Sequence, residues 1–502
     1  MNRTVFVLTL ALLVAVTSES QAQFVTESEA LGAAQAWVSS VVAGRGSWGG
    51  SPDARVREVV ELSQEGALVG YLCPVTPVGF VAVSLRRELE PVKAYSETSS
   101  FDLEATDGAP MLLRQCMKRV VDRIEAAAGP IRTARSEELV PLLEIDYRAT
   151  WDELERGAVR VGERSGVPRT RGDYQEGEIL VPTSWHQNPP YNDDCPNMGC
   201  SYPLHGSYNT NALVGCVSTA GSQIMHYWGW PRYGVGSGYD DTNDWPNMLN
   251  TYTWRTWPLP AGFVGPDGTL CTQAQIDAVA ELCSEVGVAV EMAYSCSLSS
   301  SYTEDTEAVY ENLYRYSITC VRKNRPDFTA VEWFERIRTQ VNANRPIHYR
   351  ILGHSIVADG WQVTSRLMQY HMNYGWNDGH NMWYTVDALH YPAGGSTADE
   401  YMLESIYPAA AMGTSFAGSY PVPSFPDRYF DRDCQGSSAT FAAGQHLHFL
   451  PGIVATCASG TVLFQSTDAS PTRLYSRGLS GTGGVLRGGT IKLSPGGQVS
   501  LR

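Results

Sequence analysis

One stretch of the sequence, residues 215–220, reads Gly-Cys-Val-Ser-Thr-Ala and places a cysteine at the start of a predicted helix. From here, apolar residues recur at helical spacing until Pro231 interrupts the pattern. The apolar positions are Val217, Ala220, Ile224 and Trp228. A thiol in the first helical turn faces unpaired N–H groups and the positive end of the helix dipole, and both favour the thiolate. We therefore expect Cys216 to be a nucleophile, the alternative being a buried structural cysteine.

A nucleophilic thiolate needs a base and a group that orients this base. Downstream, residues 353–360 read Gly-His-Ser-Ile-Val-Ala-Asp-Gly, and residues 370–376 read Tyr-His-Met-Asn-Tyr-Gly-Trp. His354 and Asn373 thus follow Cys216 in the order Cys, His, Asn, and the Cys–His gap falls within the roughly 130–150 residues of the papain-like arrangement. The usual papain signature around the cysteine is absent, which excludes a close relative of papain.

Upstream of the cysteine, residues 185–192 read Trp-His-Gln-Asn-Pro-Pro-Tyr-Asn, and the Gln187 amide could donate to a developing oxyanion. Together these elements resemble the streptopain family of secreted bacterial cysteine peptidases. The shared elements are Gln-Xaa-Xaa-Pro-Tyr-Asn at 187–192, Gly-Cys-Val-Xaa-Thr-Ala and Gln-Ile-Met-Xaa-Tyr within 215–227, His-Xaa-Xaa-Val-Xaa-Asp-Gly at 354–360, and Asn-aromatic-Gly-Trp at 373–376. Residues 280–294 also look like the middle segment of the family, so the resemblance covers about residues 183–410.

The resemblance implies a catalytic Cys–His dyad, an oxyanion hole lined by Gln, and an Asn-Trp pair that orients and covers the imidazole. By resemblance, the roles of nucleophile, general acid/base, oxyanion donor and orienting amide fall to Cys216, His354, Gln187 and Asn373. The chain departs from the family at Tyr374, where Trp is usual, although a Tyr ring can still cover an imidazole. We count Tyr374 and Trp376 as supporting residues.

The sequence predicts an α+β fold, a two-lobed papain-like cysteine peptidase domain with an N-terminal α+β propeptide and a small C-terminal all-β module. We divide the chain into a signal peptide (1–22), an inhibitory propeptide-like domain (23–160), an activation linker (161–182), the catalytic domain (183–415), and a linker with a β-rich module that resembles a β-solenoid (416–502). In the family such a propeptide masks the active site. The linker, which mixes Gly, Pro and Arg, is typical of segments that proteases cut.

Local patterns predict the elements of these domains. A capping box at Thr26 and Glu29 precedes a predicted helix over 30–42, and Thr329 with Glu332 forms a second box before a helix over 330–342. The second helix should bury Val331, Phe334, Ile337 and Val341. A further helix is expected over 111–127. Strands are expected over 56–62, 68–73, 79–85, 347–351, 354–363, 368–374 and 382–386. The resemblance to the propeptide of the family implies a further strand over 94–96.

The 502 residues are 43% hydrophobic and carry a net charge of −16, which suits several globular domains and argues against nucleic acid and anionic membranes as partners. Arg3, an apolar run over 5–16 and the small residues near Ala22 predict a secretory signal, so we expect a secreted protein without a transmembrane segment. We expect no cofactor.

Export permits disulfides, and the odd count of 11 cysteines leaves one free thiol unless chains cross-link. We expect Cys195–Cys200 and Cys434–Cys457 as local pairs and a reduced, buried Cys283. No zinc-type pattern of Cys or His is present, so no structural metal is predicted.

Alternatives exist for several residues. His371, Asp378 and His380 could suggest a metal site, but a strand and a turn explain them better. Asp359, an alternative to Asn373, should point away from His354 and act structurally. We expect His226, Ser218 and Thr219 to be structural, whereas His186 could line the cleft.

The leading functional hypothesis is a secreted cysteine endopeptidase made as a zymogen, acting on protein or peptide substrates and inhibited by its own propeptide. One alternative is a non-catalytic adhesin or binding protein on a degenerate peptidase scaffold. A further alternative is a thiol amidase or transpeptidase, which would share the acyl-enzyme step.

Overall fold

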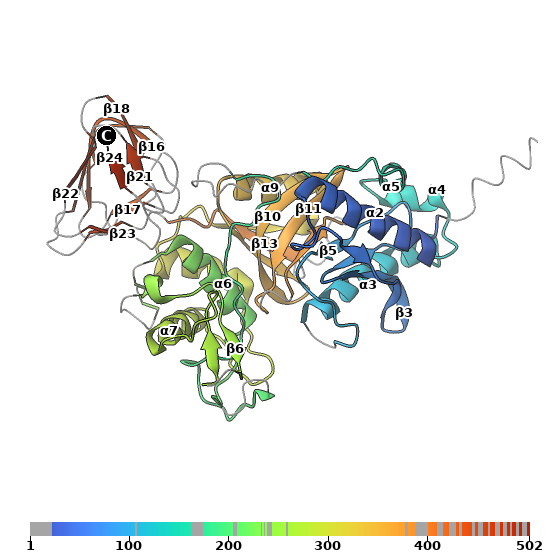
Figure 1. The fold of residues 1–502 in the computed structure, drawn as a ribbon, viewed down its shortest axis with the longest axis horizontal. Coiled ribbons are helices and arrows are strands. Elements are labelled where there is room, and N and C mark those ends of the chain that lie inside the picture. Colours follow the sequence, from blue (N-terminus) through green and yellow to red (C-terminus); the bar gives the residue numbers. More distant parts are fainter. Residues whose placement is uncertain are drawn as a thin grey trace, which may run out of the picture. The chain divides into compact units, whose positions relative to one another are not determined.

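The computed structural model describes residues 23–408, apart from 106–107, 163–173, 204–207, 232, 235, 238–242, 258–259, 377–379, 388 and 390–399, and the strand residues between 415 and 501 (Figure 1). Two compact units make up the chain. The first unit contains Met1–Arg164, Asn324–Ile337 and Gly360–Glu400, and the second contains Ser165–Lys323, Arg338–Asp359 and Tyr401–Arg502. The predicted signal peptide and most of the predicted activation linker lie outside the described residues.

The first unit begins with helix α2 (Glu27–Arg45), whose capping box at Thr26 and Glu29 is present as predicted. Antiparallel strands follow, with β1 (Arg55–Val56) and β2 (Val60–Gln64) both pairing with β3 (Ala67–Thr76). The predicted single strand over 56–62 is therefore wrong in detail, since the chain forms two short strands there. Strand β4 (Phe80–Val83) pairs with β3, and β5 (Ala94–Ser96) pairs with β4. Helix α3 (Gly108–Ala128) comes after β5 in the sequence.

Helices α2 and α3 cover opposite faces of this sheet. On one face the Cys73 thiol lies 3.9 Å from the carbonyl oxygen of Ala30 in α2. On the other, a Cβ on Gly70 would lie 2.2 Å from Cε of Met117 in α3, so the helix approaches the strand closely where the side chain is absent. Because Gly70 and Cys73 are three residues apart, they point to opposite sides of β3.

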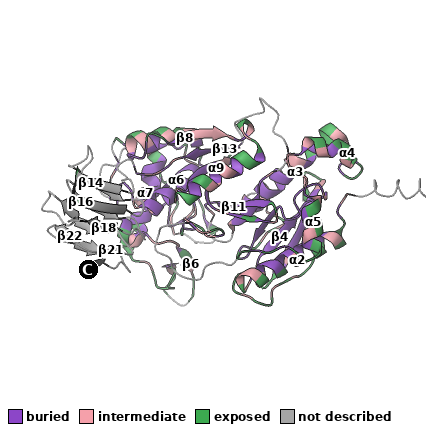
Figure 2. Ribbon diagram, turned by 90° about the horizontal axis from the view of Figure 1, so that it is seen from above, coloured by how far each residue is buried: buried purple, intermediate pink, exposed green. Residues whose placement is uncertain are grey.

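The strands of the N-terminal segment continue into strands from late in the sequence. Strand β5 pairs antiparallel with β12 (Met382–Thr385), and β12 pairs with β11 (Leu367–Asn373). Strand β10 (His354–Thr364) begins in the second unit and ends in the first. Figure 2 shows β4 and β11 in the colour of buried residues, because both of their faces are covered.

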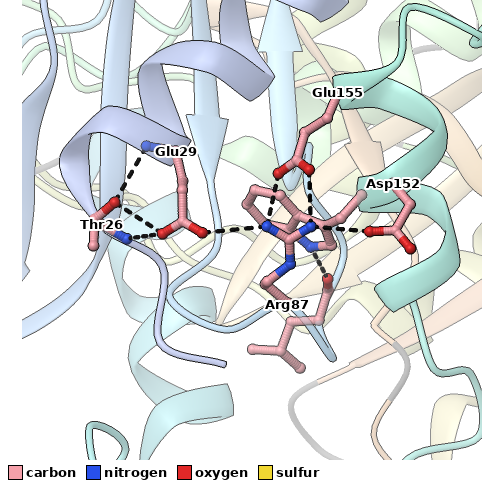
Figure 3. A network of polar contacts seen from close by, with 7 residues as sticks. Thr26, Glu29, Arg87, Asp152 and Glu155 are labelled. Atoms are coloured by element: carbon pink, nitrogen blue, oxygen red, sulfur yellow. Dashed lines mark hydrogen bonds and ion pairs between the residues drawn. The ribbon is translucent and has the colours of Figure 1, made fainter. Parts of the chain in front are cut away.

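The Arg87 side chain contacts two helices of the N-terminal segment (Figure 3). Its guanidinium donates to Glu29 at 3.2 Å and, in helix α5 (Arg148–Glu155), to Glu155 at 2.7 Å and Asp152 at 3.1 Å. It also lies 5.4 Å from the ring centroid of Trp151. The start of α2 and the end of α5 are thus held by one side chain, although partners this exposed contribute only about 0.2–1 kcal/mol per pair.

The region before the predicted linker is helical in part. Besides α5 it contains the short helices α4 (Ser136–Leu139) and η1 (Val140–Leu142). Trp151 is fully buried, and its indole N–H donates to the Leu89 carbonyl at 2.9 Å. Helix α9 (Ala330–Asn342) begins at its predicted residue, and Thr329 and Glu332 exchange backbone-to-side-chain bonds of 2.9 and 3.2 Å.

One predicted core residue of α9 is wrong. Phe334, Ile337 and Val341 are buried as expected, but Val331 is 49% exposed. Trp333 takes the inward position instead, since it is fully buried and packs on Phe328 with ring centroids 5.9 Å apart.

The second unit is built on two packed helices, α6 (Cys216–Trp228) and α7 (Gln273–Ala289). Its strands include β9 (Ile347–Ile351), the first half of β10, β13 (Glu400–Glu404) and β8 (Val321–Asn324), in the order β10-β9-β13-β8. A hairpin of β6 (Thr253–Arg255) and β7 (Gly262–Val264) adds a small second sheet. Smaller helical turns are η3 (Trp245–Asn247), η4 (Thr303–Asp305), α8 (Thr306–Ala308), η5 (Val309–Leu313) and η6 (Arg325–Asp327), the last of which falls in the first unit.

The disulfide of the second unit joins Cys200 to Cys296. The predicted Cys195–Cys200 pair is therefore wrong. Cys195 is instead a reduced, buried residue whose pKa is raised to about 12 by burial. Cys283 is reduced and fully buried in α7, as predicted. The side chains of Cys434 and Cys457 lie outside the described residues.

The described C-terminal strands form an all-β arrangement with parallel pairing throughout. One series of pairs joins β14 (Ser415–Tyr420) to β16 (Cys434–Ala443), β16 to β19 (Val462–Ser466), and β19 to β22 (Gly484–Arg487). The others are β15 (Arg428–Phe430) with β17 (Leu447–Phe449), β16 with β18 (Ala455–Ser459), β20 (Thr472–Leu474) with β23 (Ile491–Leu493), and β21 (Leu479–Gly481) with β24 (Val499–Leu501). None of the described helices is long and apolar enough to cross a membrane.

Candidate active site

Cys216 is the first residue of α6, and its position depends on the glycine before it. Gly215 has φ of +87°, a conformation that favours glycine. A Cβ at this position would lie 2.6 Å from Sδ of Met292 and 3.1 Å from the carbonyl oxygen of Ser299. The thiol of Cys216 is half-buried and belongs to the first turn, as the sequence predicted.

The polar residues that follow Cys216 support the helix. The Ser218 hydroxyl donates to the carbonyl of Cys283 at 2.6 Å, which joins α6 to α7. The Thr219 hydroxyl donates to the carbonyl of Gly215 at 3.0 Å. Both side chains are fully buried, so they are structural, as expected, and not nucleophiles.

The electrostatics of the thiol differ from the sequence-based expectation. Burial raises the pKa of Cys216 above its ordinary value. The N–H of Ser355, the charge of Arg350 and the N–H groups of Val217 and Cys216 itself oppose this rise without cancelling it. The start of the helix does supply N–H groups, but in this form of the chain the loss of hydration dominates.

His354 stands at the start of β10, immediately after a tight turn. Strands β9 and β10 form a hairpin in which Ile351 pairs with His354. The two residues between them, Leu352 and Gly353, have φ of +47° and +80°, as a two-residue type I′ turn requires. Because Ser355 contacts the Cys216 thiol through its N–H, the hairpin brings the residue next to His354 to Cys216. His354 itself is buried.

Gln187 lies beside the chain that leads into Cys216. Its carbonyl accepts from the N–H of Val214 at 3.0 Å, and its side chain is buried. Nδ1 of His186 accepts from the N–H groups of Gln187 and Asn188, at 2.8 and 3.2 Å. His186 therefore shapes the local turn through its ring nitrogen, while its predicted place in the cleft stays a prediction.

Asn192 is a structural residue of this region whose role the sequence did not reveal. It is fully buried, and its side-chain amide donates to the Tyr202 hydroxyl at 3.2 Å and to the Ala212 carbonyl at 3.0 Å. Asn192 thereby fixes the loop that leads to Cys216. The motif Gln-Xaa-Xaa-Pro-Tyr-Asn already contains this residue, and its amide side chain was the available signal.

Asn373 ends β11 in the first unit. Its side-chain oxygen accepts from the N–H of Gly375 at 3.1 Å. The rings of Tyr374 and Trp376 stack with centroids 5.9 Å apart and an interplanar angle of 10°. Tyr374 is buried, so an aromatic residue does occupy the position where the family usually has Trp. The roles of these three residues toward the imidazole stay predictions.

The remaining candidates are structural. The Asp359 carboxylate accepts from the N–H of Val181 at 3.1 Å, in line with a supporting role. His226 is enclosed by Trp185 at 5.0 Å between ring centroids, and burial lowers its pKa to about 4. His371 packs on Trp383 with ring centroids 5.4 Å apart. Among the described residues, which exclude Asp378, no group of three His, Cys, Asp or Glu is placed to hold a metal.

Comparisons with known proteins agree with this geometry. Residues 185–384 match the Peptidase C10 family, and residues 22–120 match the Spi protease inhibitor family. Streptopain of Streptococcus pyogenes is 22% identical over 345 residues, which cover 64% of this chain and 74% of that protein. The thiol protease/hemagglutinin PrtT of Porphyromonas gingivalis is 25% identical over 247 residues, or 46% of this chain and 26% of that protein.

Two solved structures from Prevotella intermedia are also similar. A prointerpain A fragment has 21% identity and a TM-score of 0.49, and the match covers 70% of this chain and 98% of that one. Active interpain A has 22% identity and a TM-score of 0.35, with coverage of 48% and 98%.

An N-terminal domain of the protease-inhibitor type, followed by an α+β domain with a cysteine at a helix start, defines the precursor of a papain-like cysteine peptidase. Residues 185–384 form a peptidase domain of the Peptidase C10 family, the streptopain-like cysteine peptidases. The predicted family and fold class are confirmed.

Proposed function

We propose that the protein is a secreted cysteine endopeptidase, made as a zymogen, in which Cys216 is the nucleophile and His354 the general acid/base. The observation that carries the proposal is the meeting of the α6 start with the β9–β10 hairpin, where the Ser355 N–H contacts the Cys216 thiol. Because Ser355 follows His354 directly in the sequence, this contact supports a position of His354 near Cys216.

The proposed reaction follows from these positions. The Cys216 thiolate attacks the peptide carbonyl, and the imidazolium of His354 gives its proton to the leaving amine. His354 then takes a proton from water, which hydrolyses the thioester. The side-chain amide of Gln187 and the N–H of Cys216 would stabilise the oxyanion, and one such donor is worth about 2.7–4 kcal/mol of barrier. Asn373 would orient the imidazole, with Tyr374 and Trp376 in support.

Inhibition by the N-terminal segment is the second part of the proposal. The match of residues 22–120 to an inhibitor family and the pairing of β5 with β12 support it. Cutting within 161–182, followed by removal of the segment, should switch on activity. Secretion rests on the predicted signal at residues 1–22.

Hydrolysis of denatured casein tests the peptidase assignment. The wild-type chain, after the linker has been cut and the N-terminal fragment removed, should hydrolyse casein, and Cys216→Ala treated in the same way should not. Cys271→Ala is a matched control, because Cys271 is another half-buried, reduced cysteine of the same unit. If Cys216→Ala retains activity, the nucleophile assignment is wrong.

Two further measurements separate the alternatives. Absence of any rapid alkylation of Cys216 would favour a non-catalytic binding protein. Rapid alkylation without casein hydrolysis would favour a thiol amidase or transpeptidase. Full activity of the uncut wild-type chain would contradict the zymogen proposal, whereas persistence of the uncut chain in both wild type and Cys216→Ala would point to an external activating protease.

A further inference from the structure

Arg350 is a charged residue of the candidate site that the sequence did not single out. It lies in β9 directly opposite Ser355 of β10, whose N–H contacts the Cys216 thiol. Directly opposite residues of an antiparallel pair project to the same face of a sheet. Arg350 is therefore the cross-strand neighbour of the residue that touches the nucleophile.

The guanidinium of Arg350 is held close to this point. Its Nη1 donates to the Thr303 hydroxyl at 3.3 Å, and that hydroxyl lies 2.5 Å from the hydroxyl of Ser355. Thr303 is fully buried at the start of η4, so it offers a fixed partner. A Cβ on Gly353, the residue before His354, would lie 3.9 Å from Nη2 of Arg350.

Several charged and titratable groups surround this guanidinium. Arg322 of β8 lies 3.9 Å from the ring centroid of Tyr401 and 3.6 Å from the Glu304 carboxylate, while Arg350 lies 6.0 Å from the same ring. On β9, burial and the charge of Arg350 lower the pKa of His348 to about 3, so this imidazole is neutral. The group therefore contains two guanidinium cations, one carboxylate and a neutral imidazole, with His354 at the start of the next strand.

We propose that Arg350 is a positioning residue of the peptidase reaction, which places a permanent positive charge beside Cys216 and thereby stabilises the thiolate. This inference rests on the proposed role of Cys216 as the nucleophile. Burial works against the thiolate, and an imidazolium supports it only while the imidazole is protonated. An arginine stays charged at every accessible pH, so its support persists after the imidazole has lost its proton.

The pH dependence of alkylation tests the inference. After the linker has been cut and the N-terminal fragment removed, the fraction of Cys216 modified by iodoacetamide is measured by mass spectrometry of the peptide that carries it. Removing a nearby opposite charge shifts a pKa by roughly 1–3 units, so Arg350→Gln should raise the midpoint by about one pH unit or more. The rate ratio of anionic iodoacetate to neutral iodoacetamide should fall, and Arg350→Lys should restore both quantities.

Arg322→Gln is the matched control, since it removes the same charge from the same cluster at a residue held by Tyr401 and Glu304. It should leave the midpoint close to that of the wild type. An unchanged midpoint in Arg350→Gln, or an equal shift in Arg322→Gln, would overturn the inference. Should Arg350→Gln not fold, Thr303→Val removes the hydroxyl that holds the guanidinium and should raise the midpoint by a smaller amount, and no rise would count against the inference.

The same measurements test the role of Cys216 and the role of Arg350 separately. If Cys216 of the wild type reacts no faster than Cys271, the proposed nucleophile is wrong. If the wild-type Cys216 reacts rapidly and the variants of Arg350 share its midpoint, the nucleophile stands and the role of Arg350 is wrong.

Discussion

Tyr95 lies directly opposite Trp383 in the antiparallel pair of β5 and β12. One of these residues belongs to the inhibitor-type segment and the other to the segment that matches the peptidase family. Around this pair the Thr385 N–H donates to the Lys93 carbonyl at 2.8 Å, and the Thr385 hydroxyl donates to the Val92 carbonyl at 2.6 Å. The N-terminal segment is therefore attached through backbone ladder bonds as well as side chains.

We predict that cutting the linker alone does not release the N-terminal fragment at neutral pH. The β5–β12 pairing and the buried bonds of Thr385 should hold it without a covalent connection. Size-exclusion chromatography after limited proteolysis should show both fragments in one peak. Thr385→Val removes the hydrogen bond to Val92, worth about 1 kcal/mol, as well as the bond that the hydroxyl accepts from the Gln369 amide at 3.1 Å, and should weaken retention several-fold. Separate elution of the wild-type fragments would contradict the prediction.

The buried Lys93 gives a prediction for pH dependence. Its ammonium donates to Glu90 at 2.5 Å and to the Thr385 carbonyl at 3.2 Å, and it also contacts Asp387. Burial alone would lower the pKa of Lys93, but the charges of Asp387 and Glu90 raise it above its ordinary value. A raised folded-state pKa stabilises the fold fully below the unfolded-state value near 10.4, and this contribution is lost as pH rises through the folded-state pKa.

Lys93→Met should therefore lower the free energy of unfolding at neutral pH by about 3–5 kcal/mol, because two carboxylates lose their buried partner. Unlike the wild type, this variant should regain stability as mild acid protonates those carboxylates. Urea unfolding at several pH values measures both effects. Lys118→Met serves as the control, since Lys118 pairs with the exposed Asp122 at 2.7 Å and should change stability by less than about 1 kcal/mol. A Lys93→Met variant as stable as this control would refute the prediction.

Gly215→Ala should reduce activity much more than Gly229→Ala. Both glycines flank α6 with positive φ, but a Cβ on Gly215 would clash with Met292, whereas nothing lies within 4 Å of a Cβ on Gly229. Displacing Cys216 by roughly 1 Å can reduce the rate about 100-fold. Casein hydrolysis, with circular dichroism to verify folding, compares the variants. Equal losses in both would show that backbone strain alone, and not the position of the thiol, limits activity.

The disulfide yields the fourth prediction. Cys200 and Cys296 are 96 residues apart in sequence. Removal of a native disulfide typically costs about 2–5 kcal/mol. Cys200→Ser should lower the free energy of unfolding by that amount, as should Cys296→Ser, whereas Cys195→Ser should leave the disulfide intact. Peptide mapping without reductant should recover the Cys200–Cys296 peptide pair. Recovery of a Cys195–Cys200 pair would contradict this assignment.

Local signals explain why much of the fold was predictable. The capping box at Thr26 and Glu29 and the one at Thr329 and Glu332 each involve residues three apart, so the sequence alone specifies the helix starts. The strand over 347–351 was predicted with its observed bounds, because a buried run between turn residues is also a local pattern.

The sequence-based predictions failed where residues distant in sequence determine the local structure. Cys195 and Cys200 are near in sequence, but the partner of Cys200 comes from a loop beyond α7, which spacing could not reveal. Val331 fitted the helical period, yet the neighbours of Trp333 determine which face turns inward. Arg350 lacked any motif, since its importance comes from the cross-strand register that places it opposite Ser355.

The parallel pairing of the C-terminal strands has a consequence for how this part of the chain tolerates change in length. Residue 415 pairs with 435, 440 with 463, 462 with 484 and 472 with 491, so each strand finds its partner 19 to 23 residues further along. Repeats that contact mainly their neighbours behave as a one-dimensional stack. Loss or gain of a whole repeat would therefore leave the flanking ladders in register.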